Sequence, residues 1–327
     1  MTGQDAVPEL SIVIPCFNEA ANVRAICAAV TVQAERHALG HEIILIDNGS
    51  TDGTRQIMRD LCAEDARIRV ILNNRNYGQM RSPTHGLYQA EGRAVIGMCA
   101  DFQDPPGLIR EFLCQWRDGA QVVLGQRRSE RASPLLRAAR HVGYGFLNRF
   151  GDYPVIPGAT GFGLFDREVI DTLATWNEPE PFFRGMVVES GFRIALVPFD
   201  RPERAAGESK NDFAALASFA LSGLAGSAKS LLRLPLFLSF YVGLLAFGLL
   251  IAAPVALALG GSVWALLGLS LGLLIFAILL LFLGLIGEQV RMLAERSRNV
   301  PLVIEEERIN FPARRARPAA RTHIARR

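Results

Sequence analysis

The sequence has almost no lysine, no Cys-x-x-Cys pair and little excess of charge. Lys210 and Lys229 are the only lysines, so nearly all of the positive charge is arginine, and the formal net charge at pH 7 is +3. A balance this close to neutral gives no reason to expect a nucleic-acid partner. The cysteines are odd in number and irregularly spaced, which argues against a disulfide framework or a zinc site and fits a reducing, cytoplasmic setting. They are Cys16, Cys27, Cys62, Cys99 and Cys114.

Charge is missing altogether from residue 234 to residue 287. Hydrophobic residues make up 50% of the chain, which is high for a soluble protein and favours a membrane part. The run is long enough for two transmembrane helices of ~20 residues each. We place them at about 234–258 and 262–287, on either side of a Gly-Gly-Ser break. The residues before them, 211–233, have apolar side chains at helical spacing and predict an amphipathic helix in the membrane interface.

Basic residues flank this charge-free run on both sides, and its centre carries none. By the positive-inside rule, the part of the chain before the run and both termini should then lie in the cytoplasm, with the protein in the inner membrane as a multi-pass protein. The residues 288–327 are expected to form a basic cytoplasmic tail, disordered from Arg308 onward. Residues 1–8 are a polar tail without the features of a signal peptide. The flanking residues are Lys229 and Arg233 before the run and Arg291, Arg296 and Arg298 after it.

Strand and helix patterns alternate through the first two thirds of the chain. Short apolar runs end in polar turns, and helical periodicity follows each turn. This alternation predicts an α/β domain at 9–210 with a mainly parallel sheet covered on both faces. The residues 158–163 are interpreted as a glycine-rich turn. The expected strands are 10–15, 41–47, 68–72, 95–100, 121–125 and 192–199.

A glycine-rich phosphate-binding turn is absent after the first strand. The residues there are Pro15-Cys16-Phe17-Asn18-Glu19. Without Gly-x-Gly-x-x-Gly, a dinucleotide-dependent dehydrogenase is not expected. The sheet is still predicted to bind a nucleotide, with Asp47 at the end of the second strand near the base or ribose and a metal ion on the phosphates.

The fourth strand ends in Asp101-Phe102-Gln103-Asp104-Pro105-Pro106. Asp101 and Gln103 are two residues apart, so both side chains can point to the same side of an extended chain. A carboxylate and an amide oxygen together suit Mg²⁺ or Mn²⁺. Asp104 is interpreted mainly as the N-cap of the helix that the prolines open.

Two basic loops follow the predicted strands. The first contains Arg127, Arg128 and Arg131, and it is either a solvated surface or an anion-binding loop. The second, residues 201–210, is either a charged tether or a phosphate-binding loop. Since both loops follow strands at the presumed active edge of the sheet, phosphate binding is a reasonable prediction for each.

Four short motifs and a later one together resemble those of family 2 glycosyltransferases. Within that family the chain is most similar to dolichol-phosphate mannosyltransferases and bacterial polyprenyl-phosphate glycosyltransferases. The paired hydrophobic runs agree with this resemblance. No single motif is decisive, but their order and spacing are specific. The motifs are Ile14-Pro15-Cys16-Phe17-Asn18-Glu19, Asp47-Asn48-Gly49-Ser50-Thr51-Asp52-Gly53-Thr54, Arg75-Asn76-Tyr77-Gly78, Ala100-Asp101-Phe102-Gln103-Asp104-Pro105-Pro106 and Arg204-x-x-Gly207-x-Ser209-Lys210.

The resemblance implies a GT-A fold and the transfer of one sugar, with inversion, from a UDP- or GDP-sugar to a polyprenyl phosphate. It also implies a divalent metal, Mg²⁺ or Mn²⁺, a membrane location and a role in cell-envelope glycan synthesis. Close packing of glycine- and alanine-rich spans would permit a homo-oligomer. The implied site residues are Pro15, Asn18, Glu19 and Asp47 for the nucleotide, Asp101 for catalysis, Asp101 and Gln103 for the metal, and Arg127, Arg131, Arg204, Ser209 and Lys210 for acceptor or donor phosphate.

Two other classes stay open. A processive polysaccharide synthase shares the fold but usually carries Gln-x-x-Arg-Trp near its membrane helices, and Gln115-Trp116-Arg117 has neither that spacing nor that position. A non-catalytic membrane scaffold is the other alternative. The presence of Asp47, Asp101, Gln103 and Lys210 counts against a scaffold.

Overall fold

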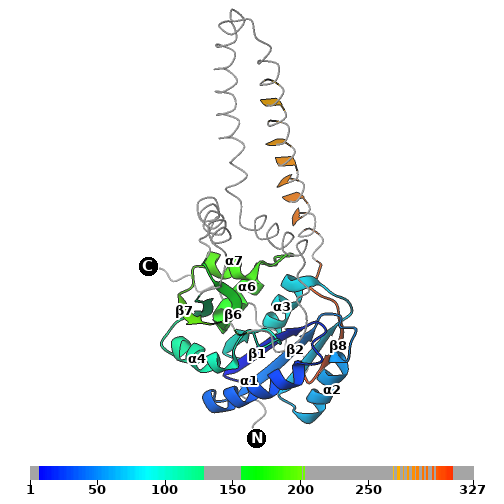
Figure 1. Ribbon diagram of the computed structural model, residues 1–327, viewed down its shortest axis with the longest axis vertical. Helices are drawn as coiled ribbons and strands as arrows, with labels where there is room; N and C mark the ends of the chain where they lie inside the picture. The colour runs from blue at the N-terminus through cyan, green and yellow to red at the C-terminus, as the bar shows by residue number, and fades with distance from the viewer. Residues whose placement is uncertain are drawn as a thin grey trace, which may run out of the picture.

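The computed structural model describes residues 7–128, 156–200, 202 and 300–311, together with single helical positions between 268 and 297 (Figure 1). Within these residues no helix is both long enough and apolar enough to cross a bilayer. The predicted interface helix at 211–233 and the first predicted span at 234–258 lie outside the described residues. Only isolated positions of the second span, 262–287, are described.

The described residues form an α/β domain around one eight-stranded sheet, in the order β7-β5-β6-β4-β1-β2-β3-β8. β6 runs antiparallel to β4 and β5, β8 runs antiparallel to β3, and the other pairs are parallel. This confirms the predicted mainly parallel sheet. The strands are β1 (Leu10–Cys16), β2 (His41–Asp47), β3 (Ile68–Asn73), β4 (Ala94–Gly97), β5 (Val122–Arg127), β6 (Ala159–Asp166), β7 (Ile194–Phe199) and β8 (Glu305–Ile309).

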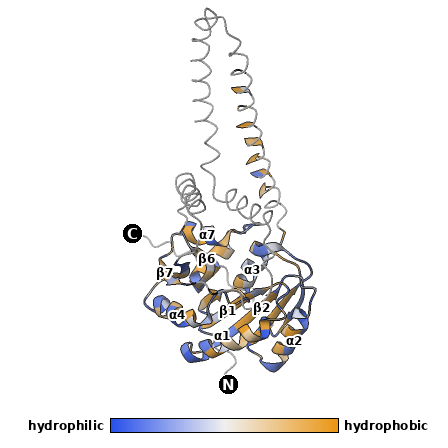
Figure 2. Ribbon diagram, viewed as in Figure 1, coloured by the Kyte–Doolittle hydropathy of each residue, from blue (hydrophilic) through white to orange (hydrophobic). Residues whose placement is uncertain are grey.

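Helices cover both faces of the sheet, as the alternation of patterns predicts. Successive side chains of a strand point to opposite faces, and β1 shows this directly. Ile12 and Ile14 join one buried cluster with helices α1, α2 and α4, whereas Val13 joins a second cluster with α3, α6 and α7. Apolar surface therefore lines both faces of the strands, and the polar surface of the helices is turned outward (Figure 2). The helices are α1 (Val23–His37), α2 (Thr54–Glu64), α3 (Gly78–Gln89), the short 3₁₀ helix η1 (Pro106–Leu108), α4 (Ile109–Arg117), α6 (Arg167–Ala174) and α7 (Phe183–Glu189).

The predicted glycine-rich turn at 158–163 is wrong, because most of it belongs to β6. Gly163 pairs with Gly97 on one side and with Leu124 on the other. A Cβ atom at Gly163 would lie 2.6 Å from the carbonyl oxygen of Val123, so a side chain does not fit there. The glycine therefore permits close approach of two strands, and only Gly158, with φ of +75°, has a turn conformation.

The predicted basic tail at 288–327 also needs correction, because residues 305–309 form strand β8 at the edge of the sheet. Arg308, where we expected disorder to begin, lies inside this strand. β8 contains almost no apolar residue; it pairs antiparallel with β3 through its backbone, and its acidic side chains form ion pairs with α2. Arg55 and Arg59 of α2 contact Glu306 and Glu307 at 2.9 and 2.7 Å.

A second set of contacts joins β8 to α3. His85 Nε2 lies 2.6 Å from Glu305 Oε1, and Arg308 Nε donates to Glu305 Oε2 at 2.8 Å. Partial burial alone would raise the pKa of Glu305, but the hydrogen bonds from His85 and Arg308 outweigh it and lower the pKa from 4.5 to about 2. Glu305 therefore stabilises the folded protein in its charged form.

This pKa predicts an acid-sensitive attachment of β8. Since the folded-state pKa lies below the usual 4.5, the stabilisation is complete above that pH and is lost as the pH falls toward about 2. Glu305→Gln should lower the midpoint of thermal unfolding at pH 7, and its difference from wild type should shrink across this acidic window. A difference that stays constant from pH 7 to pH 3 would contradict the assignment. Glu307→Gln, on the same strand, is the matched control.

Candidate functional site

The carboxyl ends of β1, β2, β3 and β4 meet at one edge of the sheet. Cys16, the last residue of β1, pairs with Asp47, the last residue of β2, and Asp47 pairs in turn with Leu72 of β3. The polar loops that follow these strands therefore share one surface, which is where open α/β sheets bind ligands. We call the segments 17–22, 48–53 and 74–77 the first, second and third edge loops.

Hydrogen bonds join the first edge loop to the second. The backbone N–H of Asn18 donates to Ser50 Oγ at 2.8 Å, and the N–H of Thr51 donates to Asn18 Oδ1 at 2.8 Å. The N–H of Glu19 donates to Thr54 Oγ1 at 2.9 Å. Asn18 has φ of +56°, a left-handed conformation that asparagine tolerates better than most residues. The structure therefore brings Asn18 and Glu19 beside the second edge loop, while the half-buried Pro15 stays within β1.

The carboxylate of Asp47, at the end of β2, holds the second edge loop by hydrogen bonds. Its side chain is fully buried, and its carboxylate accepts hydrogen bonds from the N–H groups of Gly49 and Ser50 at 3.0 and 3.1 Å. It also accepts from Arg55 Nε at 2.8 Å. With no exposed surface, Asp47 is a positioning residue in this structure. The sequence patterns do not single out Arg55 as a site residue. Its position gives one signal, because a basic residue in the first turn of a helix stands where acidic residues are favoured.

The third edge loop packs directly on the second. Gly49 has φ of +80°, and a Cβ atom there would lie 2.7 Å from the backbone carbonyl carbon of Arg75. The buried side chain of Asn48 donates to Asn76 Oδ1 at 3.0 Å and accepts from the N–H of Tyr77 at 2.8 Å. Asn48 is thus a buried connection between two loops, and nothing in its local sequence distinguishes it from an ordinary turn residue.

Asp101 and Gln103 lie in the loop after β4. The Asp101 side chain accepts from the N–H of Gln103 at 3.1 Å, and Phe102 between them has φ of +62°. The predicted N-cap role of Asp104 is wrong: the N-cap of η1 is Pro105, and Asp104 Oδ2 accepts from the N–H of Cys99 at 2.8 Å. Asp104 therefore closes the loop that contains Asp101, which is itself 4% exposed.

The donor set of this loop fits a hard divalent cation that is shared with a substrate. Among the residues that the structure describes, no three His, Cys, Asp or Glu side chains come together as metal ligands. Mg²⁺ needs no such cage, since one or two protein oxygens together with water and substrate phosphates commonly hold it. The carboxylate of Asp101 and the amide oxygen of Gln103 meet that requirement.

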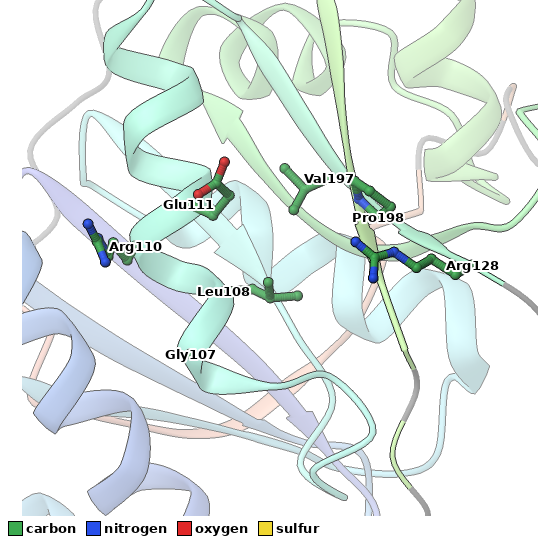
Figure 3. Close-up of a pocket in the computed structure, with 7 residues that line it drawn as sticks. All are labelled: Gly107, Leu108, Arg110, Glu111, Arg128, Val197 and Pro198. Carbon is green, nitrogen blue, oxygen red and sulfur yellow. The ribbon is translucent and has the colours of Figure 1, made fainter.

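The first basic loop begins at the end of β5. The N–H of Arg127 donates to Gly158 O at 3.0 Å, and the N–H of Arg128 donates to Phe199 O at 3.0 Å. Arg128 also lines a shallow depression of about 380 Å³ between α4 and β7, which contains none of the predicted nucleotide or metal residues (Figure 3). The remaining predicted phosphate ligands, Arg131, Arg204, Ser209 and Lys210, lie outside the described residues.

Comparison with known proteins agrees with this architecture. A family model described as glycosyl transferase family 2 matches residues 11–173. An uncharacterized glycosyltransferase of Synechocystis is 32% identical over 217 residues, which cover 66% of this chain and 68% of that protein. The bactoprenol glucosyl transferase of Shigella phage SfV is 29% identical over 241 residues, 73% of this chain and 78% of that protein.

Among solved structures, the chain resembles glucosyl-3-phosphoglycerate synthase from Mycobacterium tuberculosis, in complex with Mn²⁺, UDP-glucose and phosphoglyceric acid. The identity is 18% and the TM-score 0.46, with 67% of this chain and 79% of that chain covered. The family model and the relative at 32% identity show that the chain belongs to glycosyltransferase family 2 and is a glycosyltransferase.

Proposed function

We propose that the enzyme transfers a single sugar, with inversion, from a UDP- or GDP-sugar to a polyprenyl phosphate at the membrane. The observation that carries this proposal is the joining of the three edge loops into one polar surface at the carboxyl ends of β1 to β4. The bactoprenol glucosyl transferases to which the chain is similar support a lipid acceptor.

On the donor side, Pro15, Asn18 and Glu19 border the nucleotide, and Asp47 holds the loop beside them. Glu19 is oriented for such a contact, because its Oε2 accepts from Asn22 Nδ2 at 2.7 Å. Asp101 and Gln103 would hold Mg²⁺ or Mn²⁺. When bound, such an ion stabilises the negative charge of the departing nucleoside diphosphate.

On the acceptor side, the nucleophile is already an anion. A lipid phosphate needs no strong general base, so the main task of the protein is to bring two anions together. Arginine and lysine side chains offset that repulsion. We assign this role to Arg127, Arg131, Arg204 and Lys210, and a hydrogen bond to the phosphate to Ser209.

The membrane location follows from the charge-free run at 234–287. The described helical positions near its end support it, because Leu279, Leu283 and Ile286 are exposed by 60%, 66% and 52%. In Figure 2 the described positions of this segment are mostly coloured as hydrophobic. We propose an interface helix at 211–233 and two spans in the inner membrane, with both termini in the cytoplasm. The polyprenyl tail would then stay in lipid while its phosphate reaches the edge loops. Glycine in the spans would permit a homo-oligomer.

A nucleotide-release assay tests the proposed function. The full-length protein in detergent is mixed with each of several UDP- and GDP-sugars and Mg²⁺, with and without a short polyprenyl phosphate. The proposal predicts release of nucleoside diphosphate that requires the lipid phosphate. Equal release with and without the lipid would contradict it, and the same lipid lacking the phosphate is the control.

Lys210→Ala and Arg204→Ala are expected to lower kcat/KM for the lipid acceptor by at least about tenfold each, a loss of ~1.4 kcal/mol in transition-state stabilisation. The physical reason is that lysine and arginine at headgroup depth bind the acceptor phosphate. Nucleotide affinity should change less, and titrating both quantities on the same variants separates the two effects. Acceptor kinetics equal to wild type in both variants would make residues 201–210 a tether only.

A further inference from the structure

Arg55 lies where β2, β3 and β8 come together. Its guanidinium donates from Nε to Asp47 at 2.8 Å, from Nη2 to the carbonyl oxygen of Asn73, and from Nη1 to Glu306 at 2.9 Å. Three donors of one rigid group thus contact the ends of two central strands and the edge strand. Its side chain is 22% exposed, whereas that of Asp47 is fully buried.

These contacts continue into the edge loops. Asp47 accepts from the N–H of Ser50, and Ser50 Oγ accepts from the N–H of Asn18. A continuous chain of hydrogen bonds therefore runs from Glu306 through Arg55 and Asp47 to the first two edge loops.

We infer that Arg55 and Glu306 are positioning residues for the donor nucleotide, so that the contact of β8 with Arg55, and not the attachment of β8 in general, contributes to donor affinity. The inference rests on the proposed function, in which the edge loops bind the nucleotide. Strand β8, which follows the charge-free run in the sequence, would then contribute to nucleotide binding by the α/β domain. The residues that carry the effect lie in α2 and β8, away from the loops themselves.

The two contacts of Arg55 with acids differ in strength for a physical reason. The carboxylate of Asp47 has no access to water, so removing the charge of Arg55 leaves a buried negative charge without its charged partner. Glu306 is 53% exposed, and water replaces part of its interaction. We therefore expect a large effect from changing Arg55 and a small one from changing Glu306.

The chain offers a matched control one helical turn away. Arg59 of α2 contacts Glu307 of β8 at 2.7 Å, with exposures of 38% and 43%. Like the pair of Arg55 and Glu306, this ion pair joins an arginine of α2 to a glutamate of β8. Within the part of the chain that the structure describes, the hydrogen bonds of Arg59 go to Glu307 and none goes to Asp47. Variants of Arg59 and Glu307 therefore loosen β8 without disturbing the chain to the edge loops.

Calorimetric titration of the full-length protein with UDP and with GDP, in the presence of Mg²⁺, tests the inference. For the nucleotide that wild type binds, Arg55→Gln is expected to raise Kd by at least about tenfold, and Glu306→Gln by about threefold. Arg59→Gln and Glu307→Gln should stay within about twofold of wild type. Arg55→Lys should rescue only part of the loss, because an ammonium group cannot reproduce the planar three-way contact.

The outcomes separate the inference from the function on which it rests. If wild type binds neither UDP nor GDP, the proposed function fails and the inference fails with it. If wild type binds one of them and Arg55→Gln binds it equally well, only the inference is overturned. A Kd raised as much by Arg59→Gln as by Arg55→Gln would also overturn it, since general loosening of β8 would then suffice. Should Arg55→Gln not fold, a Kd unchanged in Glu306→Gln overturns the role of β8.

Discussion

Asp101→Asn is expected to lower turnover by at least about 100-fold, the usual cost of removing one charge-stabilising contact from an active site. The substitution tests the charge of Asp101, because asparagine keeps an Oδ1 atom that can accept the hydrogen bond from the N–H of Gln103. This hydrogen bond can therefore be kept while the negative charge is lost. The measurement is the rate of nucleoside diphosphate release with a nucleotide sugar, polyprenyl phosphate and Mg²⁺.

Asp118→Asn is the matched control, because it removes the same charge from an exposed residue just after α4. It should turn over like wild type. Excess chelator should abolish the activity of wild type, and added Mg²⁺ or Mn²⁺ should restore it. Near-normal rates in Asp101→Asn, or full activity in excess chelator, would rule out the proposed metal role of Asp101.

Asp47→Ala is expected to destabilise the protein by about 3 kcal/mol, because removing one partner of a buried ion pair leaves the other uncompensated. The variant would leave the N–H groups of Gly49 and Ser50 and the Nε of Arg55 without their acceptor. The lower end of the usual range applies, since Arg55 keeps its contacts with Glu306 and Asn73. Urea-induced unfolding of the full-length protein in detergent measures the loss.

Glu64→Ala is a suitable comparison for Asp47→Ala. Glu64 makes two hydrogen bonds to Arg24 at 2.7 and 3.0 Å, but both side chains are more than half exposed. Exposed pairs contribute little, so the unfolding midpoint should not move. An Asp47→Ala variant as stable as Glu64→Ala would show that the buried carboxylate does not hold the second edge loop.

The strands and their polar ends were predictable because buried parallel strands leave a strong signal. Continuous apolar runs such as Leu10–Pro15 end abruptly in polar residues, and parallel topology brings those ends together. The positions of Asn18, Glu19 and Asp101 at one edge follow from these rules alone. The packing that fixes them does not, since Asn48 contacts the third edge loop and Arg55 contacts β8, and both partners are distant in sequence.

The errors have equally specific causes. β8 is polar, and its contacts with Arg55 and Arg59 bridge about 250 positions of sequence, so neither periodicity nor local propensity identifies it as a strand. Gly163 was interpreted as a turn residue, because the sequence does not show that a neighbouring strand approaches too closely for a side chain. Asp104 precedes two prolines and has the pattern of an N-cap, yet its carboxylate closes the preceding loop instead.

The most direct test of the account is the mass of the lipid product. The full-length protein is incubated with a polyprenyl phosphate and the nucleotide sugar that it consumes, and the extracted lipid is analysed by mass spectrometry. The account predicts a polyprenyl phosphate heavier by one sugar unit, with one nucleoside diphosphate released for each lipid converted. A ladder of products with many sugars would indicate a polysaccharide synthase, and an unmodified lipid would indicate a different acceptor or a scaffold; either result would contradict the account.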